Sequence, residues 1–258
     1  MALPLQPGLV PTEVAFLCEM EMVTIVPRQR LESIPLLSGK TPALRPPHRA
    51  QVPFWLALLL KKQRRANIVS PPWLHADSLQ DILNQETNIN QKGFSPHPPP
   101  PMRSDGRGGS RPFGQSSSEL KPGETVLSPP FLPSCTQNAP SGYLPYHWLE
   151  FSETLLAHAA DDIPNAAEVR ALLRDLQEVR AAKMRGSTKE VNGEGGFLAL
   201  PGAGAMELAE SRGFFLGVVD GVRKLGTSAE ASRREEEEEE EERRNGRRDD
   251  DGDEEMEF

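Results

Sequence analysis

Residues 52–73, VPFWLALLLKKQRRANIVSPPW, join a run of nine apolar residues and prolines to four basic residues. A helix that crosses a bilayer needs about 20 consecutive apolar residues. The run that begins at Val52 ends at Leu60, and no other stretch of the chain is longer. The opening sequence, MALPLQPGLVPTEV, lacks the basic region of a secretory signal. We therefore expect a soluble intracellular protein in which this stretch is a buried helix with a hydrated end.

The apolar run has the spacing of a helix, and Pro53 suits the first turn, where a backbone N–H has no intrahelical partner. The predicted buried face consists of Trp55, Leu56, Leu59 and Leu60. The basic residues that follow are Lys61, Lys62, Arg64 and Arg65. Positive charge at the end of a helix favours the helix dipole. These basic residues are therefore expected to form a hydrated cap or to contact a neighbouring chain.

The sequence before this helix predicts a small β-rich domain. The segment PTEVAFLCEME suggests a short helix opened by Thr12. Residues 22–27, MVTIVP, alternate β-branched residues and end in proline, which predicts a strand. Residues 31–37 predict a second strand, at an edge because of Pro35. We place this domain, with its linking helix, at residues 12–72.

The sequence after Trp73 is helical by pattern. Residues 161–186 carry the widest stripe, at Val169, Leu172, Leu173, Leu176 and Val179. The remaining candidates for core or interface positions in this part are Trp73, Trp148, Phe215 and Val219. We predict an α-helical domain at 73–93 and 143–226, and hence an α+β chain.

Two segments differ in composition from the rest. Residues 94–142 are rich in proline, glycine and serine, and too poor in apolar residues to offset the entropy of ordering. Residues 227–258 hold six arginines and sixteen acidic residues, with eight successive glutamates from Glu235. Such a run of like charges has nothing to bury. We predict a disordered insertion at 94–142 and a disordered acidic tail at 227–258.

Patterns typical of catalysis or metal binding are missing from the sequence. Cys18 and Cys135 lie in unrelated contexts, and the histidines show no metal-ligand spacing. Asp161 and Asp162 precede a helix, where carboxylates cap more often than they bind metal. The tryptophans lie in apolar surroundings, which favours packing over stacking on bases. We expect neither an enzyme nor a bound cofactor, metal or small-molecule substrate.

Four segments together carry a resemblance to a known family: VAFLCEMEMVTIVP, VPFWLALLLKKQRRANIVSPPWL, LLAHAADDIPNAAEVRALLRDLQEVRAAKMR and MELAESRGFFLGVVDGVRKL. In this order they resemble the second "partner of Sld five" subunit family of the eukaryotic GINS replication complex. The resemblance covers residues 12–93 and 143–225. The insertion between Phe94 and Tyr143 and the acidic tail depart from the family pattern.

The resemblance implies a non-catalytic subunit of a nuclear heterotetramer, which carries its β-rich domain before its helical domain. Its implied partners are three other GINS subunits, the MCM helicase ring and a RecJ-like co-activator, in initiation and elongation of DNA replication. Fungal members are also associated with chromosome partition. The alternative is a nucleic-acid-binding module that uses the basic cluster at 61–65. Net charge is −9 and the tail alone carries −10, so the rest of the chain is nearly neutral and no global basic field favours that alternative.

Overall fold

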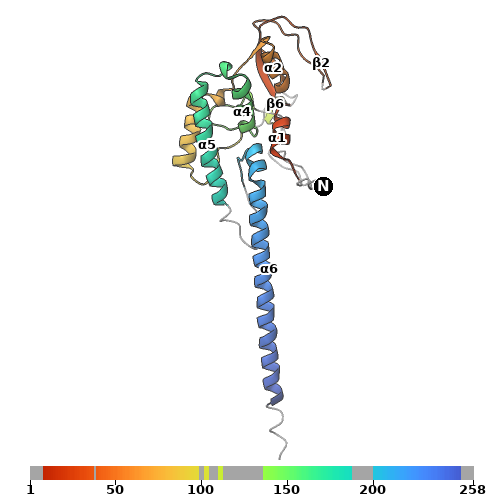
Figure 1. Cartoon of the computed structure of the whole chain (residues 1–258), viewed down its shortest axis with the longest axis vertical. Helices are drawn as coiled ribbons and strands as arrows, with labels where there is room; N and C mark the ends of the chain where they lie inside the picture. The colour runs from red at the N-terminus through yellow and green to blue at the C-terminus, as the bar shows by residue number, and fades with distance from the viewer. Residues whose placement is uncertain are drawn as a thin grey trace, which may run out of the picture. The chain divides into compact units, whose positions relative to one another are not determined.

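The structure is a computed structural model of the 258-residue chain (Figure 1). It describes residues 8–37, 39–98, 102–104, 110–112, 136–187 and 200–250, with the backbone alone for 102–104, 110–112 and 241–250. Most of the predicted insertion and the last residues of the predicted tail lie outside the described residues. The described chain is α+β, with a small β-rich part followed by helices, as the sequence predicts.

A three-stranded antiparallel sheet is the centre of the β-rich part. β1 (Met22–Pro27) lies between β4 (Ala50–Pro53) and β5 (Ala66–Ile68). Val23 pairs with Val52, and Ile25 pairs with Ala50 on one side and Ile68 on the other. Alternate residues of β1 are buried, because side chains of a strand point to opposite faces. The predicted strand at 22–27 is confirmed, whereas β4 and β5 were not predicted.

A minor pair of strands lies between β1 and β4 in the chain. β2 (Pro35–Leu36) pairs with β3 (Gly39–Lys40), and Leu31 forms an isolated bridge with Leu44. Only two residues of the predicted strand at 31–37 are therefore paired in a ladder. Gly39 has φ of 135°, a conformation that favours glycine at this tight turn.

Two helices, α1 (Pro11–Cys18) and α2 (Phe54–Lys62), belong to the same N-terminal part of the chain as this sheet. α1 carries Pro11 at its first position and buries Val14 and Cys18. α2 follows β4 directly, with Pro53 as its N-cap. α1 also packs against α4 (Trp148–His158), as Figure 1 shows. The β-rich and helical parts therefore share one hydrophobic core.

The buried face of α2 differs from the prediction at two of its four residues. Phe54, Leu56, Ala57 and Leu60 are buried, whereas Trp55 is only partly buried and Leu59 is 44% exposed. The reason is a contact that the local pattern does not encode. The Phe54 ring lies 4.6 Å from that of Phe151 on α4, and this contact sets the rotation of the helix.

The helical part begins with η1 (Pro72–Leu74), α3 (Ala76–Asn84) and η2 (Gln85–Ile89), a π turn that continues α3. After α4, the short η3 (Ala160–Asp162) leads to α5 (Ala166–Ser187). α5 starts after the predicted Asp161–Asp162 cap, because Asn165 adopts a positive φ of 52° and breaks the helix. The predicted stripe of α5 is buried from Val169 to Leu176.

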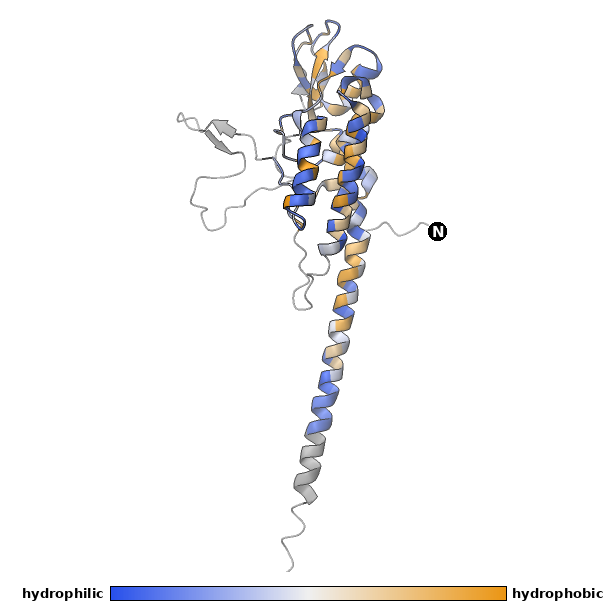
Figure 2. Ribbon diagram, turned by 90° about the vertical axis from the view of Figure 1, so that its left-hand side faces the viewer, coloured by the Kyte–Doolittle hydropathy of each residue, from blue (hydrophilic) through white to orange (hydrophobic). Residues whose placement is uncertain are grey.

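α6 (Ala205–Asp250) corrects the prediction of a disordered tail from Thr227. Its residues from 227 to 240 are all exposed, so no burial orders them. Glutamate and arginine are good helix formers, and Arg233 pairs with Glu237 one turn later. Figure 2 shows hydrophobic positions in the first part of α6 and hydrophilic colour after them. The chain divides into two compact units, with residues 212–250 of α6 in the second.

The edges of the predicted insertion are also ordered. Ser95, Thr136, Gln137 and Ala139 are buried. Within the insertion, β6 (Met102–Ser104) and β7 (Ser110–Pro112) pair antiparallel. Composition alone missed these edges, because polar side chains such as Thr136 and Gln137 are retained in a core when they find hydrogen-bond partners.

Candidate functional site

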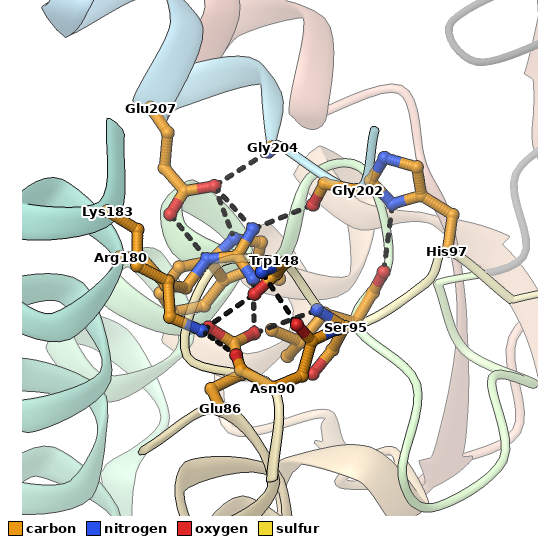
Figure 3. Close-up of polar contacts among 12 residues, drawn as sticks. Glu86, Asn90, Ser95, His97, Trp148, Arg180, Lys183, Gly202, Gly204 and Glu207 are labelled. Carbon is orange, nitrogen blue, oxygen red and sulfur yellow. Dashed lines mark hydrogen bonds and ion pairs between the residues drawn. The ribbon is translucent and has the colours of Figure 1, made fainter. Parts of the chain in front are cut away.

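A fully buried arginine lies at the centre of the helical part. Arg180 of α5 is 0% exposed, and its guanidinium reaches carboxylates from two other elements (Figure 3). Its Nη1 donates to Oε1 of Glu86 at 2.6 Å, and its Nε donates to Oε1 of Glu207 at 2.6 Å. Its Nη2 donates to Oε2 of Glu207 at 2.9 Å and to the carbonyl of Gly202 at 2.7 Å. The planar guanidinium group has several N–H donors in a fixed arrangement, so it can bond both carboxylates at once.

Glu86 of η2 is held by a second cation and by the edge of the insertion. Lys183 lies one turn after Arg180 and donates to Oε2 of Glu86 at 3.2 Å. Lys183 also donates to the carbonyls of Asn90 and Gly93, at 2.9 and 2.7 Å. The backbone N–H of Ser95 donates to Oε1 of Glu86 at 3.0 Å. These bonds attach the segment after α3 to α5.

Glu207 closes the other side of the arginine and starts α6. Its Oε2 accepts a bond from the backbone N–H of Gly204 at 2.7 Å, which satisfies a free donor at the helix start. The same oxygen accepts a bond from Nε1 of Trp148 at 3.3 Å. A Cβ on Gly204 would lie 2.8 Å from that indole nitrogen, so glycine is required there. We call Arg180, Glu86, Lys183 and Glu207 the arginine centre. It positions the first turn of α6.

The charges of this centre balance one another. Burial would raise the pKa of Glu86, but the charges of Arg180 and Lys183 and the Ser95 amide lower it overall. Burial would lower the pKa of Arg180, but Glu207 and Glu86 raise it. The four charged side chains of this centre are bonded to one another in a single network. The centre therefore holds helices together and offers no free nucleophile or base for catalysis.

A second ion cluster joins the β-rich part to the helical part. Nζ of Lys61 lies 2.7 Å from Oδ2 of Asp161 and 2.8 Å from Oδ1 of Asp162. Oδ2 of Asp162 also accepts a bond from the backbone N–H of Ile68 at 2.7 Å. Burial would lower the pKa of Lys61, but its hydrogen bonds to both aspartates raise it overall. The two aspartates therefore bind a lysine instead of capping α5.

This cluster breaks up the predicted basic patch. The side chain of Lys61 is only 10% exposed and is turned to the aspartates. Lys62, Arg64 and Arg65 are exposed. The structure therefore leaves three of the four predicted basic residues available to a partner.

Two of the three tryptophans at predicted core or interface positions lie in the interior. Trp73 and Trp148 are fully buried, and Trp73 lies 6.0 Å from the Phe151 ring. Nε1 of Trp73 donates to the carbonyl of Thr136 at 2.7 Å. Phe215 and Val219 of α6 are partly exposed.

Exposed apolar side chains gather around α1 and the turn that follows it. Phe16 is 65% exposed and Met20 is 56% exposed. We call this surface the α1 apolar edge, and it consists of Leu9, Phe16, Leu17, Met20 and Met22. Several exposed apolar side chains so near one another in the chain are typical of a surface that contacts another protein.

The described residues contain neither a metal-ligand cluster nor a membrane-spanning helix. Among them, no group of three or more acidic, histidine or cysteine side chains converges as metal ligands would. In the same part of the chain, none of the helices combines the length and the apolar character that crossing a membrane requires.

Sequence reasoning missed the arginine centre, although a signal was present. Arg180 falls on the apolar stripe of α5, four residues after Leu176 and four before Met184. Glu86 similarly continues the stripe of α3, four residues after Ile82. A charged residue at a core position needs an opposite charge nearby. Arg180 and Glu86 are opposite charges at core positions of separate helices, and this pattern is a sequence signal for an ion pair between them.

Comparison with known proteins gives two matches to family models. Residues 10–69 match the model described as PSF2 N-terminal domain, and residues 73–226 match the model described as GINS complex protein helical bundle domain. Among curated relatives, the Gibberella zeae protein named DNA replication complex GINS protein PSF2 is 66% identical over 90% of this chain and 91% of its own. The Neurospora crassa protein of that name is 60% identical over 90% of each chain. The Schizosaccharomyces pombe protein is 31% identical over 87% of this chain and 96% of its own.

Proposed function

The chain belongs to the PSF2 family of GINS complex proteins, and from that premise we propose that it is a non-catalytic scaffold subunit of a GINS heterotetramer. In this role it joins three other GINS subunits and helps to activate the MCM replicative helicase in initiation and elongation of DNA replication. The MCM ring and a RecJ-like co-activator are its wider partners, and it acts in the nucleus. A part in chromosome partition belongs to the same proposal.

The α1 apolar edge is the observation that carries the proposal of an assembly subunit. Its side chains are exposed in the single chain, and burying an apolar side chain contributes about 25 cal/mol for each Å² removed from water. The arginine centre supports the same role, because its buried charges hold helices in place and leave no reactive group free. An assembly subunit needs a rigid body that presents an apolar surface.

Co-expression with the three other subunits tests this proposal. We expect Phe16→Asp with Leu17→Asp to reduce the yield of the four-subunit assembly at least about tenfold, because charged residues at an apolar interface stay unpaired. Leu37→Asp is the control, because Leu37 is an exposed leucine that lies outside the α1 apolar edge. Equal yields from the edge variant and the control would show that the α1 apolar edge is not part of the assembly interface.

The wider partners need a separate experiment. The tagged chain, purified from its own cells, should bring the other GINS subunits, MCM subunits and the co-activator with it. Recovery of the GINS subunits without MCM subunits at any salt concentration would contradict the helicase role and leave the assembly role intact.

The alternative, a nucleic-acid module, rests on Lys62, Arg64 and Arg65, because Lys61 is paired with the aspartates. Each phosphate contact would contribute about −0.9 to the slope of log affinity against log salt. A slope near −3 that charge reversal at these three residues abolishes would support this alternative. A flat salt dependence would exclude it.

A further inference from the structure

A groove between α4 and α5 lies outside the surfaces described so far. Its volume is about 250 Å³. Small-molecule sites usually have volumes of about 300–1,000 Å³, so this groove suits one or two protein side chains better than a cofactor. It is lined by Leu149, Glu153, Leu156, Ala157, Arg170, Leu173, Arg174 and Gln177.

The floor of the groove is apolar. Leu149, Leu156 and Leu173 line it and are each at least nine-tenths buried within the chain. They come from both helices, so the floor is continuous across the helix pair. An apolar anchor side chain that enters the groove would gain contacts with all three leucines.

One rim of the groove is cationic. Arg170 and Arg174 lie one turn apart on α5, so both point to the same side of that helix. Both are exposed, and in the part of the chain that the structure describes neither forms an ion pair. Their guanidinium groups are available to a carboxylate from outside the chain.

The opposite rim is acidic. Glu153 of α4 is exposed and lines the groove. Burial raises the pKa of Glu153, and the nearby charges of Glu210 and Glu150 raise it further. Glu210 has a raised pKa for the same reasons: burial first, then Glu207 and Glu150. These carboxylates repel one another, and an external cation would relieve the repulsion.

We propose that this groove binds an amphipathic helix of another subunit of the complex. The helix places apolar residues on the leucine floor, carboxylates against Arg170 and Arg174, and a lysine or arginine against Glu153. A helix fits because recognition of this kind uses an apolar stripe with polar flanks, laid in a groove. This inference rests on the proposed function, because it needs a partner chain.

The two rims argue against other occupants. A nucleic acid would bind the arginines through phosphates but would be repelled by Glu153 and the acidic residues behind it. A second copy of this chain would have to present carboxylates to the arginine rim and a basic residue to Glu153 at the same time. The opposite signs of the rims therefore specify the direction of the bound helix as well as its charge.

Site-specific cross-linking in the intact four-subunit assembly tests the proposal. The photoreactive residue p-benzoylphenylalanine replaces Ala157, an exposed residue on the rim of the groove. We expect a cross-link to a helical segment of another subunit, identified by mass spectrometry, with acidic residues on one flank and basic residues on the other. The same probe at Ala171, an exposed residue of α5 outside the groove, should give at least about tenfold less of that product.

Charge reversal tests the recognition itself. Arg170→Glu with Arg174→Glu should lower the yield of the Ala157 cross-link about tenfold, which corresponds to about 1.4 kcal/mol. Reversing the facing carboxylates of the identified segment should restore the yield. Arg45→Glu with Arg49→Glu makes the same charge change at exposed positions of the β-rich part and should leave the yield unchanged.

Several outcomes would overturn the proposal while leaving the proposed function in place. These are an intact assembly without a cross-link from Ala157, a cross-link to a second copy of this chain, and a cross-link to added duplex DNA. Failure of the unmodified chain to assemble with the other subunits would overturn the proposed function, and this inference with it.

Discussion

The guanidinium of Arg180 lies 2.6 Å from the carboxylate of Glu86, although 94 positions separate the two residues in the chain. The contact joins α5 to the π turn after α3, and Glu207 completes it from the first turn of α6. Three segments distant in sequence are thus held by one side chain. Removing that side chain leaves two buried carboxylates without their cation.

Arg180→Ala should therefore destabilise the chain by about 3–5 kcal/mol, the usual cost of an uncompensated buried charge. Arg180→Lys should recover only part of this, because an ammonium group cannot bond both carboxylates in the same plane. Urea denaturation of the co-expressed assembly measures both variants. Arg45→Ala is the control, since Arg45 is exposed, and a loss of stability equal to that of Arg180→Ala would contradict the prediction.

The rotation of α2 gives a second test. Phe54→Ala removes a fully buried ring that packs on Phe151, and should cost about 3–5 kcal/mol. Leu59→Ala, on the exposed side of the same helix, should change the free energy of unfolding by less than about 0.5 kcal/mol. Thermal unfolding of both variants decides which face is the core. A larger loss of stability in Leu59→Ala than in Phe54→Ala would instead support the buried face that the sequence predicts.

Neighbouring aspartates provide a matched pair for the contact between the two parts of the chain. Asp162→Ala leaves the Ile68 N–H without its partner and removes one of the two carboxylates bound to Lys61, and should cost about 1–3 kcal/mol. Asp161 is 69% exposed, so Asp161→Ala should cost about 0–1 kcal/mol. Chemical denaturation at low and high salt measures both. Equal effects would show that Asp162 has no special role.

His97 predicts a dependence of stability on pH. Burial lowers the pKa of His97, and the Arg180 charge lowers it further, against the opposing effects of the Leu144 carbonyl and Glu207. The folded chain therefore binds this proton less readily than the unfolded chain. Stability should fall as the pH drops below about 6.5, the ordinary value for histidine, until the folded pKa is reached.

Melting temperatures at pH 7.5 and 5.5 test this dependence. His97→Gln should reduce the difference between the two temperatures, because glutamine does not titrate. His48→Gln, at an exposed position, should leave the difference as it is in the unmodified chain. An unchanged difference in His97→Gln would assign the pH dependence to other groups.

The insertion should be dispensable in its middle and required at its end. Replacing residues 105–130 with a Gly/Ser linker of about ten residues should preserve the assembly, because the cost of closing a loop changes slowly with its length. Deleting residues 136–140 should reduce its yield. That deletion removes the Thr136 carbonyl that accepts from Trp73, and Gln137, which accepts from the Thr24 N–H at 3.2 Å. Gel filtration of the co-expressed complex compares the two deletions.

Local patterns were sufficient for β1, for the main helices and for their order, but not for β4 and β5. Alternating β-branched residues predicted β1, and a spacing of three and four residues predicted the stripe of α5 from Val169 to Leu176. These patterns follow from the geometry of one strand or one helix against a core. The family was also accessible from sequence, because its motifs are continuous segments.

Only the tertiary structure decided which way α2 faces and where the buried charges meet. Phe54 is inside because Phe151, nearly a hundred residues later, fills the space beside it. Arg180 is tolerated in a core stripe because Glu86 and Glu207 arrive from other helices. The free energy of a buried charge or ring depends on its neighbours in space, and a local pattern holds no information on neighbours that the fold brings together.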